Sequence, residues 1–252
     1  MKAWGSAVGT IARALNSMAE AEDINKKTDK SGEKTWQQRM SGLTRTAILD
    51  AAVDCFYDLG YANTSTENIA KTAGISRGAM LHHFPTRFDL IKATVKHLNQ
   101  KRLDWYTKEQ AEVQRGAKHT RIEEGIDTYW KQLKTPEFVV FHELSVAART
   151  DAELAKVLIP ALQEFRQKHV AASRQLFPDL ALSEAWECTN YLARFLLEGM
   201  AVAKMIEGLG VPEEQMLGWL KRELRRSYQD VLSTVKRSDA ATALGQGSLT
   251  GD

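Results

Sequence analysis

The sequence predicts an all-α protein of about nine helices, with an N-terminal three-helix helix-turn-helix domain followed by a larger helical domain. Apolar residues recur at helical spacing over most of the 252 residues, and no segment alternates for long in the way a strand does. Only five prolines occur, the first of them Pro85. The hydrophobic fraction of 43% is enough to bury one or two packed cores.

The first three helices are short, and residues at their ends define them. Gly60 and Gly74 follow the first two helices, at positions where the chain favours a residue that tolerates a left-handed conformation. Ser76 is the expected N-cap of the third helix, and Pro85 stops that helix. The expected ranges are 44–59, 66–73 and 77–83.

Six longer helices are expected after them. Thr86 caps the first of the six, in which a break is expected near Trp105. Pro160 lies inside another and is expected to kink or split it, because proline lacks the N–H that a helix interior uses. The expected ranges are 87–114, 120–134, 136–149, 152–176, 184–208 and 213–237.

The two ends of the chain differ in composition from the helical body. We expect a flexible basic arm over 1–42, a helix-turn-helix domain over 43–90, a second helical domain over 91–237 and a disordered tail over 238–252. Two interpretations of the arm stay open. Its cations form either a solvated linker or a segment that follows the backbone or minor groove of DNA; they are Lys26, Lys27, Lys30, Lys34 and Arg39.

Charge and motif content exclude several classes of protein. The net charge is only +2, but residues 44–102 hold 8 Lys/Arg against 5 Asp/Glu, a local excess of +3 on the side expected to meet a polyanion. No apolar run suits a membrane span or a signal peptide, so we expect no membrane partner and a cytoplasmic location. No Walker loop, GxSxG or HExxH motif occurs, so we expect no enzyme and no cofactor.

The stretch from Gly60 to Phe84 carries the functional signal. Its two short helices are joined by a tight turn at Gly74, and Ser76 restarts the chain as a helix. The second helix is expected to pack its apolar residues Met80, Leu81 and Phe84 inward. Its small, polar and cationic side then faces outward and suits the DNA major groove; that side comprises Arg77, Gly78, Ala79, His82 and His83.

Residues 65–84 resemble the DNA-binding domain of the TetR family, whose pattern is close to T-x-x-x-I-A-x-x-A-G-[VI]-S-x-G-x-[LM]-[YL]-x-H-F. The resemblance covers under a fifth of the chain. It implies a base contact from Arg77 and a phosphate contact from His83. Leu81 stands where the family usually has Tyr, which removes a hydroxyl from the expected phosphate contacts. The DNA-contacting residues implied together are Arg45, Ser65, Thr66, Ser76, Arg77, Gly78, Ala79, His82, His83 and Arg87. Adjacent histidines on a helix diverge by about 100°, so His82 and His83 predict no metal site.

The second domain is rich in aromatic side chains that are either ordinary core or the lining of a ligand cavity. The resemblance implies a cavity, and we expect a small-molecule effector that is mostly apolar or aromatic, with Arg149 and Arg194 as partners for an anionic group. The candidate ligand-binding residues are Trp105, Trp130, Phe138, Phe141, His142, Phe165, His169, Tyr191 and Phe195.

The segment 191–206 is apolar nearly all round, so it is expected to be covered on two sides, one of them by a second subunit. The candidate homodimer residues are Ala193, Gly199, Ala203, Leu217, Leu220, Leu224 and Val231. The sequence therefore predicts a dimeric, ligand-responsive transcription regulator, most simply a repressor that binds a palindromic double-stranded DNA operator and releases it when the effector binds. The alternative is a helical small-molecule-binding protein without DNA-binding activity.

Overall fold

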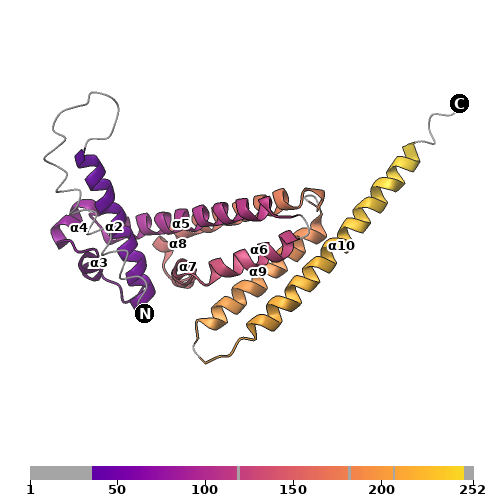
Figure 1. The fold of residues 1–252 in the computed structure, drawn as a ribbon. Coiled ribbons are helices and arrows are strands. Elements are labelled where there is room, and N and C mark those ends of the chain that lie inside the picture. Colours follow the sequence, from indigo (N-terminus) through magenta and orange to yellow (C-terminus); the bar gives the residue numbers. More distant parts are fainter. Residues whose placement is uncertain (1–35, 118–119, 181–182, 207, 247–252) are drawn as a thin grey trace, which may run out of the picture. The chain divides into compact units, whose positions relative to one another are not determined.

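The computed structural model describes residues 36–117, 120–180, 183–206 and 208–246. Within these ranges the chain forms nine α-helices and one 3-10 turn, and no strand occurs (Figure 1). This confirms the predicted all-α fold of about nine helices. The elements are α2 (Trp36–Leu59), α3 (Thr66–Thr72), α4 (Arg77–His83), α5 (Arg87–Arg115), α6 (Arg121–Leu133), α7 (Pro136–Ala147), α8 (Ala152–Leu176), the 3-10 turn η3 (Pro178–Leu180), α9 (Glu184–Lys204) and α10 (Glu213–Gln246).

The chain forms two compact units that interleave along the sequence. Unit 1 contains the described residues up to His97 together with Glu143–Ala155, and unit 2 contains Leu98–His142 and the described residues from Lys156 onward. The helices α5, α7 and α8 therefore each contribute residues to both units. No described helix is both long and apolar enough to cross a bilayer.

Unit 1 is a three-helix cluster of α2, α3 and α4 closed by the start of α5. Its core consists of apolar side chains that are almost fully buried, among them Ile48, Phe56, Met80, Phe84 and Leu90. Burying such side chains supplies about 1.5–3 kcal/mol each against the entropy of ordering the chain. Unit 1 therefore holds its short helices in fixed mutual positions.

A polar corner joins the end of α2 to the α7–α8 connection, inside unit 1. Gly60 has φ of +80°, and a side chain there would collide with the Glu143 carboxylate. That carboxylate accepts a hydrogen bond of 2.5 Å from the backbone N–H of Tyr61, and the Tyr61 hydroxyl donates to Asp151 at 3.0 Å. The guanidinium of Arg87 lies 5.2 Å from the Tyr61 ring centre. The absence of a side chain at position 60 thus allows two acidic residues to fix the turn after α2.

Unit 2 is built around α6, α9 and α10, which pack against one another, with α9 and α10 antiparallel (Figure 1). Its core includes Trp130, Leu197 and Leu224. Glu213, the first residue of α10, accepts hydrogen bonds from Trp130 Nε1 at 2.6 Å and from Lys134 Nζ at 3.2 Å. These bonds and one from Lys204 lower the pKa of Glu213 to about 2, because they stabilise its charged form.

Several helix boundaries differ from the expectation. The first helix starts at Trp36, inside the expected arm, and the rest of that arm lies outside the described residues. The helix α5 passes Trp105 without a break. Pro160 does not split α8, because Leu154, Leu158, Ala161 and Phe165 keep one buried side in register across it. The last helix continues to Gln246 instead of ending near Arg237, through part of the expected tail.

Candidate functional site

The helix α4 presents a polar and cationic side to solvent. Arg77, Gly78 and His82 are exposed, whereas Met80 and Phe84 are buried at 1% and 2% exposure. Leu81 is 44% exposed, so its expected inward packing is wrong: it lies one position after Met80, on the side of the helix turned away from the core. The exposed side of α4 therefore combines two polar side chains with a glycine and an exposed leucine.

Gly78 occupies α4 without a packing reason among the residues that the structure describes. A Cβ atom at this position would lie 3.9 Å from Ser76 Oγ, an ordinary contact, and its backbone has no positive φ. A glycine inside a helix costs about 0.5–1 kcal/mol relative to alanine. The described residues around Gly78 therefore leave room for a side chain, and packing among them does not explain the glycine.

Serine hydroxyls define the starts of α3 and α4. Ser65 Oγ accepts from the backbone N–H of Asn68 at 3.1 Å and donates to the Asn68 side chain at 2.6 Å, and Ser76 Oγ accepts from the N–H of Ala79 at 3.2 Å. Both hydroxyls act as caps in this structure. Thr66, the first residue of α3, and Ala79 are half-buried. The caps orient α4 independently of any contact with DNA.

Two arginines expected at phosphates also contact their own chain. Arg45 donates to the carbonyl oxygen of His83 at 3.2 Å, and its guanidinium lies 4.3 Å from the Phe84 ring centre. Arg87 Nη2 lies 3.4 Å from the carbonyl oxygens of Tyr61 and Thr64. Both side chains remain exposed. Burial, His82 and Arg45 lower the pKa of His83, which favours its neutral form.

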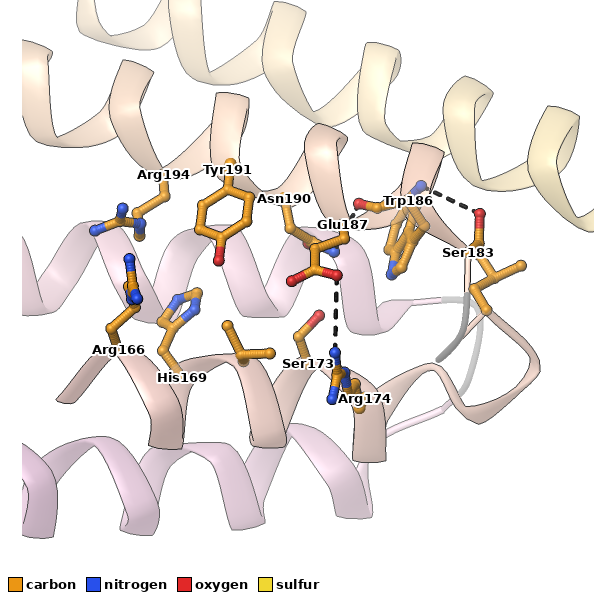
Figure 2. A pocket seen from close by; sticks show the side chains of 12 residues that line it. Arg166, His169, Ser173, Arg174, Ser183, Trp186, Glu187, Asn190, Tyr191 and Arg194 are labelled. Atoms are coloured by element: carbon orange, nitrogen blue, oxygen red, sulfur yellow. Dashed lines mark hydrogen bonds and ion pairs between the residues drawn. The ribbon is translucent and has the colours of Figure 1, made fainter. Parts of the chain in front are cut away.

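Unit 2 contains two adjoining cavities. The inner chamber lies among α5, α6, α8, α9 and α10 and holds about 600 Å³ of space, its open mouth included. The outer chamber lies between α8 and α9 and is shown in Figure 2; it holds about 460 Å³, a volume that includes the solvent space at its opening. The two chambers share lining residues and so meet at one boundary; the shared residues are His169, Ser173, Trp186, Asn190 and Arg194.

Of the nine residues expected to bind a ligand, His169 and Tyr191 line these chambers. Phe195 is 59% exposed instead, on α9. The others do not line either chamber, because they are packed into the core of unit 2 or against it: Trp105, Trp130, Phe138, Phe141, His142 and Phe165. Of the two arginines expected to meet an anion, Arg194 lines both chambers, and Arg149 is an exposed residue of unit 1.

The lining residues that sequence reasoning missed follow a helical stripe. On α8, Ser173 and Arg174 lie seven and eight residues after Arg166, and on α9 Asn190 precedes Arg194 by four. One sequence signal could have identified these lining residues. It is the recurrence of polar residues at helical spacing on two helices that also carry apolar faces. The inner chamber adds residues from other helices that were not expected there, including Tyr106, Gln110, Arg121, Ile122 and Ile126. Its lining also includes two aromatic residues that could be expected in a cavity, Tyr129 and Trp186.

A chain of polar and aromatic contacts runs through the wall of the inner chamber. Tyr129 donates to Glu198 Oε1 at 2.6 Å, and Arg194 donates to the same oxygen at 3.1 Å. The His169 ring stacks on Tyr106 at 5.3 Å and meets Tyr129 edge-on at 5.1 Å. Burial, and then the charge of Arg194, lower the pKa of His169 to about 4, so His169 is neutral at physiological pH.

Arg102 is a buried cation in unit 2. Its guanidinium lies 3.9 Å from the Phe141 ring centre and 4.2 Å from that of Phe165. Its Nε and Nη1 atoms have no hydrogen-bond partner in the described part of the chain. Burial lowers its pKa to about 10, while Tyr129, Glu198 and Glu137 act in the opposite direction. Arg102 is therefore still charged at neutral pH, held mainly by two aromatic faces.

An exposed apolar stripe runs along α9. Cys188, Leu192, Phe195 and Gly199 follow one another at spacings of four, three and four residues, and all four are exposed. Leu192 and Phe195 are 64% and 59% exposed. The dimer residues expected from the sequence divide differently. Gly199 is exposed and Ala203, Leu217 and Val231 are half-buried, but Ala193, Leu220 and Leu224 are buried in the core of their own unit and are not available to a partner.

Known proteins resemble both the helix-turn-helix and the whole chain. Residues 48–94 match the family "Bacterial regulatory proteins, tetR family". An uncharacterized HTH-type transcriptional regulator of Mycobacterium tuberculosis is 30% identical over 192 residues, which is 74% of this chain and 95% of that protein. The HTH-type transcriptional regulator CymR of Pseudomonas putida is 28% identical over 152 residues, which is 60% of this chain and 70% of CymR.

Solved structures show the same fold. A putative TetR-family transcriptional regulator from a Rhodococcus species aligns with a TM-score of 0.54 at 19% identity, over 75% of this chain and 98% of that one. The exposed α4, the caps that fix it and the identity shared along most of the chain agree with one another. The chain belongs to the TetR family of bacterial regulatory proteins and is a helix-turn-helix transcriptional regulator.

Proposed function

We propose that the protein is a repressor that reads a palindromic operator as a homodimer through α4 and releases it when a small, mostly apolar molecule enters the chambers of unit 2. The observation that supports DNA reading most directly is the exposed side of α4. There, Arg77 stands free of ion pairs among the described residues, next to a glycine whose small size none of these residues requires. An arginine with two parallel donors suits the O6 and N7 acceptors of guanine.

The exposed stripe of α9 suits contact with a second copy of the chain. The residues of the stripe recur at spacings of four, three and four, which is the spacing at which two helices interlock side chains. The stripe has few charges, and Gly199 at its end allows close approach of a partner helix. A twofold interface that uses the same stripe from both subunits is self-complementary. It gives the dimer two copies of α4, as a palindrome requires.

The effector site is linked to DNA binding through α5. This helix contributes Arg87–His97 to unit 1 and Leu98–Arg115 to unit 2, where Tyr106 and Gln110 line the inner chamber. A ligand that fits only one position of α5 therefore favours one state of the helix-turn-helix. The size of the effect is set by the difference in ligand affinity between the two states.

The test is operator selection followed by a matched pair of variants. The full-length protein is used to select duplexes from a random library at about 100 mM salt, since affinity for DNA depends on salt. Arg77→Ala is expected to weaken binding to the selected duplex roughly 10–100-fold while leaving binding to unrelated duplexes nearly unchanged. Lys92→Ala removes one exposed charge from α5 and serves as the control, because it should weaken both kinds of binding slightly and equally.

Two results would reject the proposal. Failure of the wild-type protein to enrich any duplex would favour the alternative, a ligand-binding protein without DNA-binding activity. Equal losses for Arg77→Ala on selected and unrelated duplexes would show that α4 does not read bases.

A further inference from the structure

The two chambers differ in the chemistry of their walls. Apolar and aromatic side chains dominate the inner chamber, with Ile122, Ile126 and Leu197 among them. The outer chamber is lined by three arginines, Arg166, Arg174 and Arg194, against one carboxylate, that of Glu187. A molecule that spans both chambers therefore meets an apolar wall at one end and an excess of positive charge at the other.

The arginines of the outer chamber are not equally neutralised. Arg174 pairs with Glu187 at 3.7 Å across the chamber, and Arg194 pairs with Glu198 at 3.1 Å along α9. Arg166 forms no ion pair with any described residue. Figure 2 shows Arg166 on α8 and Arg194 on α9 directing their guanidinium groups toward each other, with His169 beside them. Two facing cations repel each other unless an anion lies between them.

Neutral donors complete the lining where the chambers meet. Trp186 is 4% exposed, lines both chambers, and its indole N–H finds no hydrogen-bond partner among the described residues. A buried donor without a partner is destabilising, by the cost of removing it from water. The acceptor that Trp186 lacks can be supplied by a bound molecule. His169 lies at the same boundary, is neutral, and offers one further ring nitrogen as a donor.

We infer that the effector is an organic carboxylate whose apolar body occupies the inner chamber and whose carboxylate lies between Arg166 and Arg194. This inference rests on the proposed function, because it names the chemical class of the molecule that the regulator senses. Guanidinium groups bind carboxylates with charge-assisted hydrogen bonds, which are about twice as strong as neutral ones. The apolar body is either a hydrocarbon chain or an aromatic ring, and the two are separated by the choice of probe.

The experiment compares each acid with its uncharged amide. Calorimetric titration of the full-length protein uses decanoate and decanamide as the chain pair, and 3-phenylpropanoate and 3-phenylpropanamide as the ring pair. At least one acid is expected to bind about tenfold or more tightly than its amide, since a hydrogen bond to a charged group is worth roughly twice a neutral one. The acid that binds more tightly identifies the body as a chain or a ring.

Two exposed residues of α8 provide matched variants. Arg166→Gln removes the unpaired cation of the chamber and is expected to reduce affinity for the acid about tenfold, with affinity for the amide unchanged within about twofold. Lys168→Gln removes the same charge two residues away, where the side chain pairs with Glu164 at 3.7 Å and does not line the chamber. It is expected to leave both affinities unchanged within about twofold.

Three outcomes would overturn the inference. The first is equal affinity for acid and amide, and the second is an equal loss of acid and amide affinity in Arg166→Gln. The third is no binding of either acid at about 1 mM, a concentration that detects interactions as weak as about 4 kcal/mol. Operator selection by the wild-type protein is carried out without any probe. DNA binding that persists while the acids fail would therefore reject the carboxylate alone and leave the regulator intact.

Discussion

The reading helix α4 and the chambers of unit 2 are built in opposite ways. The seven residues of α4 are fixed by a cap at Ser76 and by two buried side chains, and its polar residues face solvent. The inner chamber takes its walls from five helices spread over more than a hundred residues of sequence, and Tyr106, Tyr129 and Trp186 in that wall are buried. Unit 1 thus exposes its functional groups, whereas unit 2 encloses those of its inner chamber.

This difference has an energetic consequence. A functional residue on α4 changes the stability of unit 1 little when it is replaced, because its side chain was already in water. In the wall of the inner chamber a polar side chain such as that of Tyr129 or Trp186 is buried, and its replacement changes stability by the cost of desolvation as well as by lost contacts. Substitutions in unit 1 should therefore separate function from stability, and substitutions in the inner chamber should couple them.

The largest expected effect comes from disrupting the proposed dimer, because a change in unit 2 should then weaken DNA binding by unit 1. Phe195→Arg places a charge on the exposed stripe of α9 and is expected to convert the dimer to a monomer, which weakens operator binding by about 100-fold or more. Sedimentation and DNA titration measure the two effects. Ile159→Arg is the control, since Ile159 is 50% exposed on α8, away from the stripe. A Phe195→Arg protein that remains dimeric would show that the partner binds elsewhere.

The next effect is a pH dependence confined to unit 2. The pKa of His169 is about 4 in the folded protein, below the value of 6.5 that applies when the chain unfolds. Between pH 6.5 and 4 the unfolded chain binds a proton that the folded chain does not, so the free energy of unfolding falls as pH falls, by up to about 3 kcal/mol. Above pH 6.5 this contribution is constant. Urea unfolding at several pH values should show a shallower decline for His169→Phe than for wild type.

A decline of identical steepness in the two proteins would mean that His169 is protonated without penalty in the folded state. Its stacking between Tyr106 and Tyr129 would then not exclude water.

Arg102→Met should stabilise unit 2. The substitution removes a buried charge with two unpartnered N–H groups and keeps a flexible side chain of similar length between two phenylalanine rings. We expect the free energy of unfolding to rise by about 1–3 kcal/mol, because methionine also interacts favourably with aromatic rings. Thermal and urea unfolding test this. A loss of stability would show that contact with Phe141 and Phe165 outweighs the desolvation of the guanidinium.

The smallest expected effect on stability is that of Gly78→Ala. This substitution should raise stability while it weakens DNA binding. Gly78→Ala should raise the free energy of unfolding by about 0.5–1 kcal/mol, since alanine favours the helix and its Cβ fits. The same methyl group should weaken binding to the selected operator, because it prevents close approach of α4 to the bases. Chemical unfolding and DNA titration on one preparation measure both quantities. Unchanged DNA affinity would place the bases beyond the reach of position 78.

Sequence reasoning succeeded where structure is determined locally. The cap at Ser76, the turn at Gly74 and the existence of each helix depend on residues a few positions apart, and all of them lie where expected. The cap at Ser65 was not foreseen, because Ser65 was assigned to a phosphate contact. It failed for Leu81, because a helix of two turns has too few residues for a reliable apolar face.

The chambers were harder to predict, since their lining depends on how distant helices pack. Phe138, Phe141 and Phe165 were expected in the cavity as a group of aromatic residues, but such residues fill cores as readily as cavities. Arg166, which no sequence pattern singled out, lines the outer chamber because α8 turns that side toward α9. Likewise, the periodic leucines of α10 were assigned to a partner although Leu220 and Leu224 contact their own core.

The stripe on α9 also makes the two thiols of the protein chemically unequal. Cys55 is buried, its Sγ lies 3.4 Å from Thr72 Oγ1, and burial raises its pKa, so it reacts slowly with electrophiles. Cys188 is exposed beside Leu192 on the stripe. A maleimide fluorophore should therefore attach selectively to Cys188 in the unmodified protein, and its emission would report directly whether another surface covers that side of α9.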